Sequence, residues 1–233
     1  MSTLDIITGS DNTNDNVVGT TGDDIIVTGN GNDAIDADNG NDTVVAGAGD
    51  DDVHGGDGND ILLGDDAAAG NGNDRIFGDN GDDQIAGMVG NDELHGGSGD
   101  DVIYGDQIGD DQSGHVGGDD NIFGDQGNDR LFGSDGNDNI TGGSQDDVLT
   151  GGSGSDTFNF STAEGDERDV ITDFHSGEDI VSITGVGADF SLADHLTDTA
   201  DGAVLSTGDG QNIVFAGLTA ADLEAHPNDF HFS

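Results

Sequence analysis

Positive charge is what this sequence lacks most. Its 233 residues include three arginines and no lysine against 51 acidic residues, so the formal net charge is −48. Self-repulsion of that size opposes any compact state. It also excludes nucleic acid as a partner, because a polyanion repels a phosphate backbone. Only 31% of the residues are hydrophobic, a composition typical of disordered chains. The chain therefore either stays unfolded or folds with cations.

Other absences narrow the possible classes of protein. There is no cysteine, which excludes disulfides and thiolate metal sites. No apolar segment is long enough for a membrane span or an N-terminal signal peptide. Only nine residues precede the first repeat described below, so we expect no catalytic domain before it. If the protein is exported, we expect a route that needs no N-terminal signal.

The acidic residues are almost all of one kind. Five of the 51 are glutamate, which leaves 46 aspartates beside 43 glycines and a single proline. A merely solubilising surface has no reason to avoid glutamate so strongly. Aspartate is short, tolerates turn conformations and can reach a cation held against its own loop. The composition therefore indicates many tight turns that carry carboxylates.

A nine-residue repeat fills the first two thirds of the chain. Counting an irregular first copy (Ser10–Val18) and two copies with insertions, there are 15 repeats, ending at Asn159. Position four is glycine in 13 of them, with Thr13 and Gln145 as the exceptions. Position six is aspartate in every repeat: Asp15, Asp24, Asp33, Asp42, Asp51, Asp60, Asp74, Asp83, Asp92, Asp101, Asp120, Asp129, Asp138, Asp147 and Asp156. Position eight is apolar in every repeat: Val17, Ile26, Ile35, Val44, Val53, Leu62, Ile76, Ile85, Leu94, Ile103, Ile122, Leu131, Ile140, Leu149 and Phe158.

Each repeat position has a physical task. Glycines allow the first six residues to curl into a loop that presents carbonyl oxygens. The last three residues form a short strand with position eight inward. Two repeats then make one 18-residue coil, and stacked coils leave gaps lined by carbonyls and position-six aspartates. The sequence predicts an all-β fold, a parallel β-roll (a right-handed β-solenoid) over residues 1–159 with a β-rich C-terminal cap over 160–233.

This repeat resembles the RTX (repeats-in-toxin), or haemolysin-type, calcium-binding nonapeptide family. The resemblance implies that the 15 position-six aspartates bind Ca²⁺, which hard oxygen ligands also favour over a transition metal. Eight odd and seven even loops leave 7 + 6 gaps, so we expect about 13 ions at most in the roll. The alternative is that these aspartates are only solvated turn residues.

The outward positions seven and nine differ between the two predicted sheets. They are apolar at ten of 14 places in even-numbered repeats (the even face) and at four of 16 in odd-numbered repeats (the odd face). We expect the even face to be covered by the chain's own C-terminal segment, a second copy or another protein. If it is covered, we expect less than half of each of these side chains to be exposed: Ile61, Leu63, Val102 and Tyr104. The alternative is that β-branched residues merely favour strands.

Two insertions interrupt the repeats. They fall in the seventh repeat (66–70) and the eleventh (around 108–117). Both repeats are odd, so both insertions are expected to bulge from the same edge. Reading Gly105–Ser113 as a degenerate extra repeat is less favourable, because Ser113 would then enter the core.

The last third has a different pattern. Residues 168–183 resemble the segment that closes the roll in RTX proteins, which implies that Asp169, Asp173 and Asp179 are further calcium ligands. Strands are expected at 203–207 and 212–215 and a helix at 219–225. The ending 228–233 resembles the uncleaved C-terminal signal of type I secretion substrates, although an ordinary strand end is the alternative. The resemblance implies an extracellular protein handled by type I secretion machinery.

No feature of the sequence indicates an enzyme. Neither His-Glu-x-x-His nor Gly-x-Ser-x-Gly occurs, and the seven histidines are scattered. His54 and His95 occupy position nine two odd coils apart and are interpreted as surface residues rather than zinc ligands. We therefore expect a secreted calcium-binding protein with a structural or interaction role. The alternative is a calcium-dependent polysaccharide-binding or enzyme-assisting module.

Overall fold

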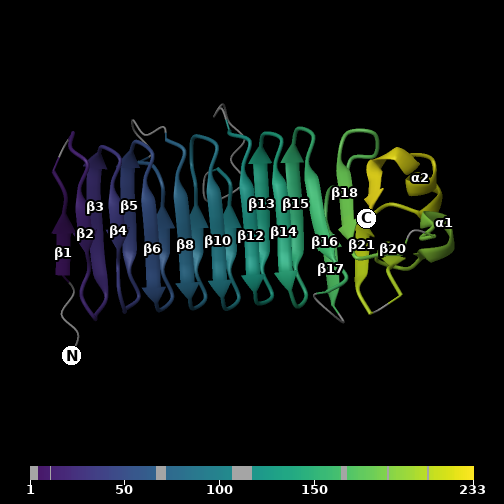
Figure 1. Cartoon of the computed structure of the whole chain (residues 1–233), viewed down its shortest axis with the longest axis horizontal. Coiled ribbons are helices and arrows are strands. Elements are labelled where there is room, and N and C mark those ends of the chain that lie inside the picture. Colours follow the sequence, from purple (N-terminus) through teal and green to yellow (C-terminus); the bar gives the residue numbers. More distant parts are fainter. Residues whose placement is uncertain are drawn as a thin grey trace.

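The chain forms an elongated stack of coils with a cap at its C-terminal end (Figure 1). The computed structural model describes residues 5–10, 12–66, 72–106, 117–163, 167–187, 189–208 and 210–233. Most of both predicted insertions lies outside these ranges, so their expected bulging stays a prediction. No helix in the described ranges is both long and apolar enough to cross a membrane.

Two sheets run along the stack and face each other across the core. The even sheet contains, in spatial order, β1 (Asp5–Thr8), β3 (Asp24–Asn30), β5 (Thr43–Ala48), β7 (Ile61–Leu63), β9 (Gln84–Ala86), β11 (Val102–Tyr104), β13 (Arg130–Asp135), β15 (Val148–Ser153), β17 (Arg168–Ile171), β21 (Asn212–Ala216), β20 (Gly202–Ser206) and β19 (Leu196–Asp198). The odd sheet contains β2 (Asn16–Val18), β4 (Ala34–Asp36), β6 (Asp52–Asp57), β8 (Arg75–Asn80), β10 (Glu93–Ser98), β12 (Asn121–Gln126), β14 (Asn139–Ser144), β16 (Thr157–Ser161), β18 (Ile180–Thr184) and β22 (Phe230–Phe232).

The pairing register follows the repeat. Each roll strand pairs in parallel with the strand two ahead in sequence, so position eight lies beside position eight: Val44 pairs with Leu62, and Leu62 with Ile85. Consecutive strands therefore alternate between the sheets, and two repeats close one coil. The predicted all-β parallel β-roll is confirmed.

Many strands are longer than the three residues predicted. β6 spans six residues, because it continues through positions one to three of the next repeat. Gly55 at position one faces inward, and Gly56 at position two pairs with Asp79 of the next coil. Gly56 has φ 102°, a left-handed conformation that glycine adopts without strain. The repeat pattern gave no sign of this second paired segment, because its residues show no apolar alternation.

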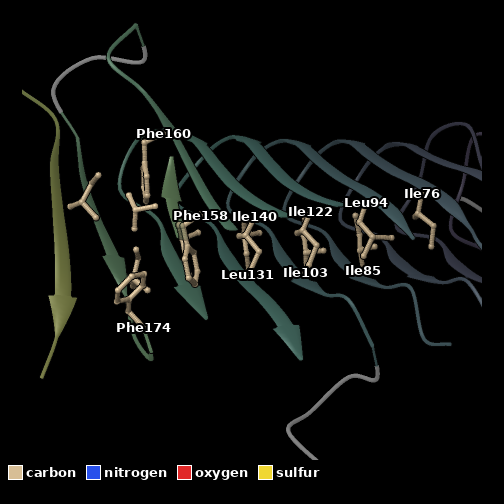
Figure 2. Close-up of a cluster of buried hydrophobic side chains, with 14 of the residues drawn as sticks. Ile76, Ile85, Leu94, Ile103, Ile122, Leu131, Ile140, Phe158, Phe160 and Phe174 are labelled. Carbon is tan, nitrogen blue, oxygen red and sulfur yellow. The ribbon is translucent and has the colours of Figure 1, made fainter. Parts of the chain in front are cut away.

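The core is a row of position-eight side chains between the two sheets. Fourteen of the 15 are buried, and Val17 of the first repeat is partly buried. Figure 2 shows Ile76 to Ile140 following one another along the stack, contributed alternately by the two sheets. At the C-terminal end, Phe174 packs against Phe158 and Phe215 with ring centroids 6.3 and 5.3 Å apart. Aromatic rings thus close the end of the row.

The cap continues the roll before it departs from it. β17 and β18 extend both sheets, and β22 then pairs in parallel with β18. β20 pairs antiparallel with β21 and β19. The two predicted strands correspond to β20 and β21, and the predicted helix corresponds to α2 (Ala220–Glu224), so all three predictions are confirmed. Thr219 and Asp222 form a capping box at the N-terminus of α2. α1 (Leu192–His195) and a 3₁₀ turn (Pro227–Asp229) complete the cap.

The C-terminal segment does not cover the even face. Its strands extend the ends of the two sheets, and both short helices lie beyond the last coil (Figure 1). The four test residues are less than half exposed as expected, with Ile61 at 40%. Neighbouring in-register side chains, such as the stacked rings of Tyr104 and Phe132 (centroids 4.9 Å apart), account for this shielding. Covering by the chain's own C-terminal segment is therefore wrong for the described residues, while covering by a partner stays a prediction.

The core row predicts where stability is sensitive to truncation. In saturating calcium, Ile122→Ala should lower the free energy of unfolding by about 2–5 kcal/mol, because it leaves a cavity between two coils. Ile61→Ala, on the outer face of the even sheet, should cost less than about 1 kcal/mol. Urea titrations followed by circular dichroism measure both, and equal losses would contradict the placement of the core.

Candidate metal centres

The position-six aspartates are buried at the two edges of the roll. From Asp24 to Asp156 they are at most 3% exposed, and only Asp15 in the first repeat is more open. The adjacent residue at position five is exposed in every repeat. The loop backbone therefore turns one side chain inward and its neighbour outward.

In 13 of these aspartates, from Asp33 onwards, one carboxylate oxygen joins two coils by a hydrogen bond. The backbone N–H of Asp42 donates to Asp60 Oδ1 at 2.7 Å, and that of Asp101 donates to Asp129 Oδ1 at 2.8 Å. The same bond joins every position-six residue of one coil to that of the next, from Asp15 to Asp156. These aspartates thus form a hydrogen-bond ladder along each edge.

The other oxygen of most of these carboxylates has no protein partner. Among the described residues, Oδ2 is buried without a hydrogen bond in 13 repeat aspartates: Asp33, Asp42, Asp51, Asp60, Asp74, Asp83, Asp92, Asp101, Asp120, Asp129, Asp138, Asp147 and Asp156. In the ten repeats from Asp60 onwards, this oxygen is directed towards the position-one glycine of its own repeat. A Cβ added to Gly87, for example, would collide with Asp92 Oδ2 and with the Gly105 carbonyl oxygen of the next coil. A buried ionised oxygen without a partner is strongly unfavourable.

The burial of these carboxylates raises their pKa values. Burial raises the pKa of Asp101 and Asp129 to about 7, that of Asp74 and Asp147 to about 8, and that of Asp120 to about 9. Neighbouring aspartates add to the increase, while the backbone N–H that each accepts opposes it. Without a compensating positive charge, the folded state therefore favours protonated carboxyls.

These residues fit calcium. Thirteen of the 15 loops offer an unpartnered carboxylate oxygen, in several of them close to a backbone carbonyl oxygen of the next coil, which is a hard all-oxygen donor set of the kind that Ca²⁺ prefers. No three carboxylate, imidazole or thiolate groups among the described residues converge on one point. The remaining ligands of an ion would therefore be backbone carbonyls and water.

Position five carries a second ladder that the sequence reasoning missed. Its residue is Asn or Asp in 14 of 15 repeats, with Ser155 as the exception. Here the bond runs the opposite way: the N–H of Asn59 donates to Asn41 Oδ1 of the preceding coil, at 2.9 Å. The shared carbonyl-like oxygen of Asn and Asp at this position is the signal that could have revealed it.

Two of the three cap aspartates prolong the position-six ladders, and the third accepts other backbone N–H groups. Asp169 and Asp179 accept the N–H groups of Asp147 and Asp156 at 3.0 and 3.1 Å, and both are buried. Asp173 accepts the N–H groups of Gly151 and Gly152, one with each oxygen. Asp179 also has both oxygens bonded, because Oδ2 accepts the N–H of His175. The cap therefore satisfies its carboxylates by hydrogen bonds to a greater extent than the roll does.

Four further buried acids were missed: Asp65, Asp106, Glu167 and Asp229, of which Asp229 accepts the backbone N–H of Gly177. Glu167 accepts the backbone N–H of Gln145, the repeat residue that replaces glycine at position four. Asp65 and Asp106 lie at position two, directly before the two insertions, and both are buried. The residue type at position two varies from repeat to repeat, so the repeat pattern did not indicate a special role for Asp65 and Asp106.

His54 and His95 lie on the odd face, as expected for surface residues. They alternate with Phe77 and Phe123 in a stack of rings whose centroids are 4.6 to 4.9 Å apart. His54 Nδ1 lies 3.1 Å from Asp79 Oδ2, and His95 contacts Glu93 and Asp125 through different ring nitrogens. The two histidines are separated by a phenylalanine and do not share a site.

The raised pKa values predict folding by acid in the absence of metal. The folded-state pKa values near 7 to 9 exceed the ordinary aspartate value of about 3.9, so the folded state binds more protons between about pH 4 and pH 9. Its stability should therefore rise as pH falls through that window and be lost as pH rises. Circular dichroism in calcium-depleted buffer should show more β-structure at pH 5 than at pH 8. Identical spectra would contradict the burial of these carboxyls.

Comparison with known proteins agrees with this geometry. The model of the RTX calcium-binding nonapeptide repeat (4 copies) matches residues 9–44, 36–68, 64–93, 80–107, 116–149 and 132–161. No curated protein matches the sequence.

Two solved structures are similar to parts of the chain. The AlgE6R3 subunit of the Azotobacter vinelandii mannuronan C5-epimerase is 26% identical over 55% of this chain and 78% of its own, with TM-score 0.40. The extracellular lipase LipA from Serratia marcescens is 20% identical over 94% of this chain, with TM-score 0.45; the match spans 40% of the lipase. The repeat-model matches extend over more than half of the sequence, and the chain belongs to the family of RTX calcium-binding nonapeptide-repeat proteins.

Proposed function

We propose that the repeat aspartates bind calcium ions in the loops along both edges of the roll, and that this binding drives folding. The main evidence for this proposal is that 13 repeat aspartates each have one buried oxygen without a hydrogen-bond partner. Calcium bound there supplies the positive charge that offsets the burial of the carboxylates and their mutual repulsion. About 13 ions in the roll would neutralise about 26 of the 48 net negative charges. The three cap aspartates are proposed as further ligands.

Each repeat aspartate has two tasks in this proposal. Oδ1 accepts a backbone N–H from the preceding coil, which fixes the carboxylate and the distance between loops. Oδ2 is thereby held in place for a cation. Because this hydrogen bond joins two different coils, the ligand oxygens are held in place only when the coils are stacked. Binding free energy then becomes folding free energy.

Export gives this coupling a use. A chain that stays unfolded where calcium is scarce can pass through type I secretion machinery, and external calcium then folds it. We propose on this basis an extracellular protein with a structural or interaction role and no catalytic activity of its own. The tail proposed as the secretion signal ends in β22, paired with β18. It therefore becomes part of the fold after export.

The polysaccharide-binding alternative finds little support on the odd face. Sugar rings bind to flat, accessible faces of aromatic side chains. Phe77 and His95 have ring neighbours on both sides, at 4.6 to 4.9 Å between centroids. Their faces are therefore occupied within the stack. A glycan array with and without calcium tests this alternative directly.

The first test is the calcium dependence of folding. At pH 7.5 the full chain should show a disordered circular dichroism spectrum in chelator and a β-rich spectrum in millimolar calcium. The physical reason is that the uncompensated buried carboxylates disfavour the stack. Calorimetric titration should show the binding heat and the folding heat together. Unchanged spectra would refute the coupling.

A pair of neighbouring substitutions tests the ligands. Asp101→Asn keeps the Oδ1 acceptor but removes the buried charge, whereas Asp100→Asn removes an exposed one at position five. Asp101→Asn should weaken or abolish one calcium site and increase β-structure in the metal-free protein. Asp100→Asn should change neither by much. Calcium titration of both variants measures this, and equal behaviour would contradict a ligand role for position six.

A further inference from the structure

Asp65 differs from three other aspartates at position two. Asp38, Asp79 and Asp125 have φ between 71° and 74°, and their side chains are half-buried or exposed. Asp65 does not adopt this left-handed conformation and is 1% exposed. It directly precedes the first insertion, where the chain leaves the regular coil path. The change of backbone conformation turns its carboxylate inward.

One oxygen of Asp65 repairs the interrupted backbone ladder. In a regular coil the position-three N–H donates to the position-two carbonyl of the preceding coil, as Asp57 does to Asp38 at 2.9 Å. At the seventh repeat the corresponding N–H, that of Val89, donates instead to Asp65 Oδ2 at 3.3 Å. The side chain thus replaces its own backbone carbonyl as acceptor.

The same substitution of acceptor recurs at the second insertion. The N–H of Asp135 donates to Asp106 Oδ2 at 2.9 Å, and Asp106 again holds position two. Asparagine could accept this bond equally well and without burying a charge. Both insertions nevertheless carry aspartate there, which indicates a use for the negative charge.

The second oxygen of Asp65 indicates that use. Oδ1 is buried and has no hydrogen-bond partner. The loop that Asp65 contacts through Val89 belongs to the ninth repeat, whose own aspartate, Asp92, has a buried, unpartnered Oδ2. This loop therefore has two buried carboxylates with an unpartnered oxygen beside it, those of Asp65 and Asp92, whereas a regular loop has one.

We propose that Asp65 is an additional calcium ligand that, with Asp92, makes the loop of the ninth repeat a tighter calcium site than a regular loop. The proposal rests on the proposed function, because it assumes that Asp92 binds calcium. The extra charge raises affinity, since calcium affinity rises with the number of ligating carboxylates. Backbone carbonyls complete the ligand set, because no three acidic side chains converge among the described residues.

The test compares Asp65→Asn with Asp38→Asn in the full chain. Both remove one negative charge from position two, and asparagine keeps the acceptor that Val89 needs. Competition with a chromophoric chelator measures the dissociation constant of the first calcium ion bound. Asp65→Asn should weaken it by at least about tenfold, and Asp38→Asn should leave it within about twofold. Circular dichroism in saturating calcium confirms that each variant folds.

Each outcome decides the proposal. A first dissociation constant unchanged in Asp65→Asn, or equally weakened in both variants, overturns it while leaving calcium binding by the repeats intact. Absence of calcium binding in the unaltered chain overturns the proposed function as well. If Asp65→Asn does not fold, Asp65→Gly is titrated with the same criteria, because glycine holds position two in repeats such as the fifth and sixth.

Discussion

The structure depends on the double role of one carboxylate per repeat. Thirteen of the 15 position-six aspartates accept a backbone N–H of the preceding coil with one oxygen, and in the same 13 the other oxygen is buried without a protein partner. The arrangement that forms this hydrogen bond therefore also buries a second oxygen, which is unfavourable for an ionised carboxylate. A fold of this kind is incomplete without cations. The excess of aspartate over glutamate follows, because a longer side chain would not fit against its own loop.

The hydrophobic core is too thin to offset this cost alone. Each repeat adds one inward apolar side chain at position eight and one small inward residue, glycine in most repeats, at position one, so the row in Figure 2 is narrow. Stability is then built mainly from interactions between neighbouring coils, as in other repeat proteins. The position-five and position-six ladders, which run in opposite directions, provide such interactions at both edges.

At the two ends of the roll, the carboxylates are hydrogen-bonded differently from those in its middle. In the first repeat, Asp15 accepts hydrogen bonds from Ser10, which lower its pKa, and it remains partly open. At the other end the cap provides Asp173 and Asp179, each with both oxygens bonded, and Phe174 covers the core. The insertions are handled in a similar way, since Asp65 and Asp106 supply acceptors that the interrupted backbone no longer offers. Side-chain carboxylates thus complete the stack wherever its backbone pairing stops.

The sequence alone determined the coil length, the inward residues, the repeat aspartates and three of the cap elements, β20, β21 and α2. Position eight and position six recur every nine residues, and such periodicity is a local property that any pairing must obey. Only the tertiary structure decided which oxygen each aspartate commits to a hydrogen bond and that strands extend into positions one to three. It also showed that the described residues of the cap extend the two sheets and do not cover the even face. It also brought Asp65 towards the loop of Asp92. These facts depend on contacts between coils, which are about 18 or more residues apart in the chain and leave no periodic mark in the sequence.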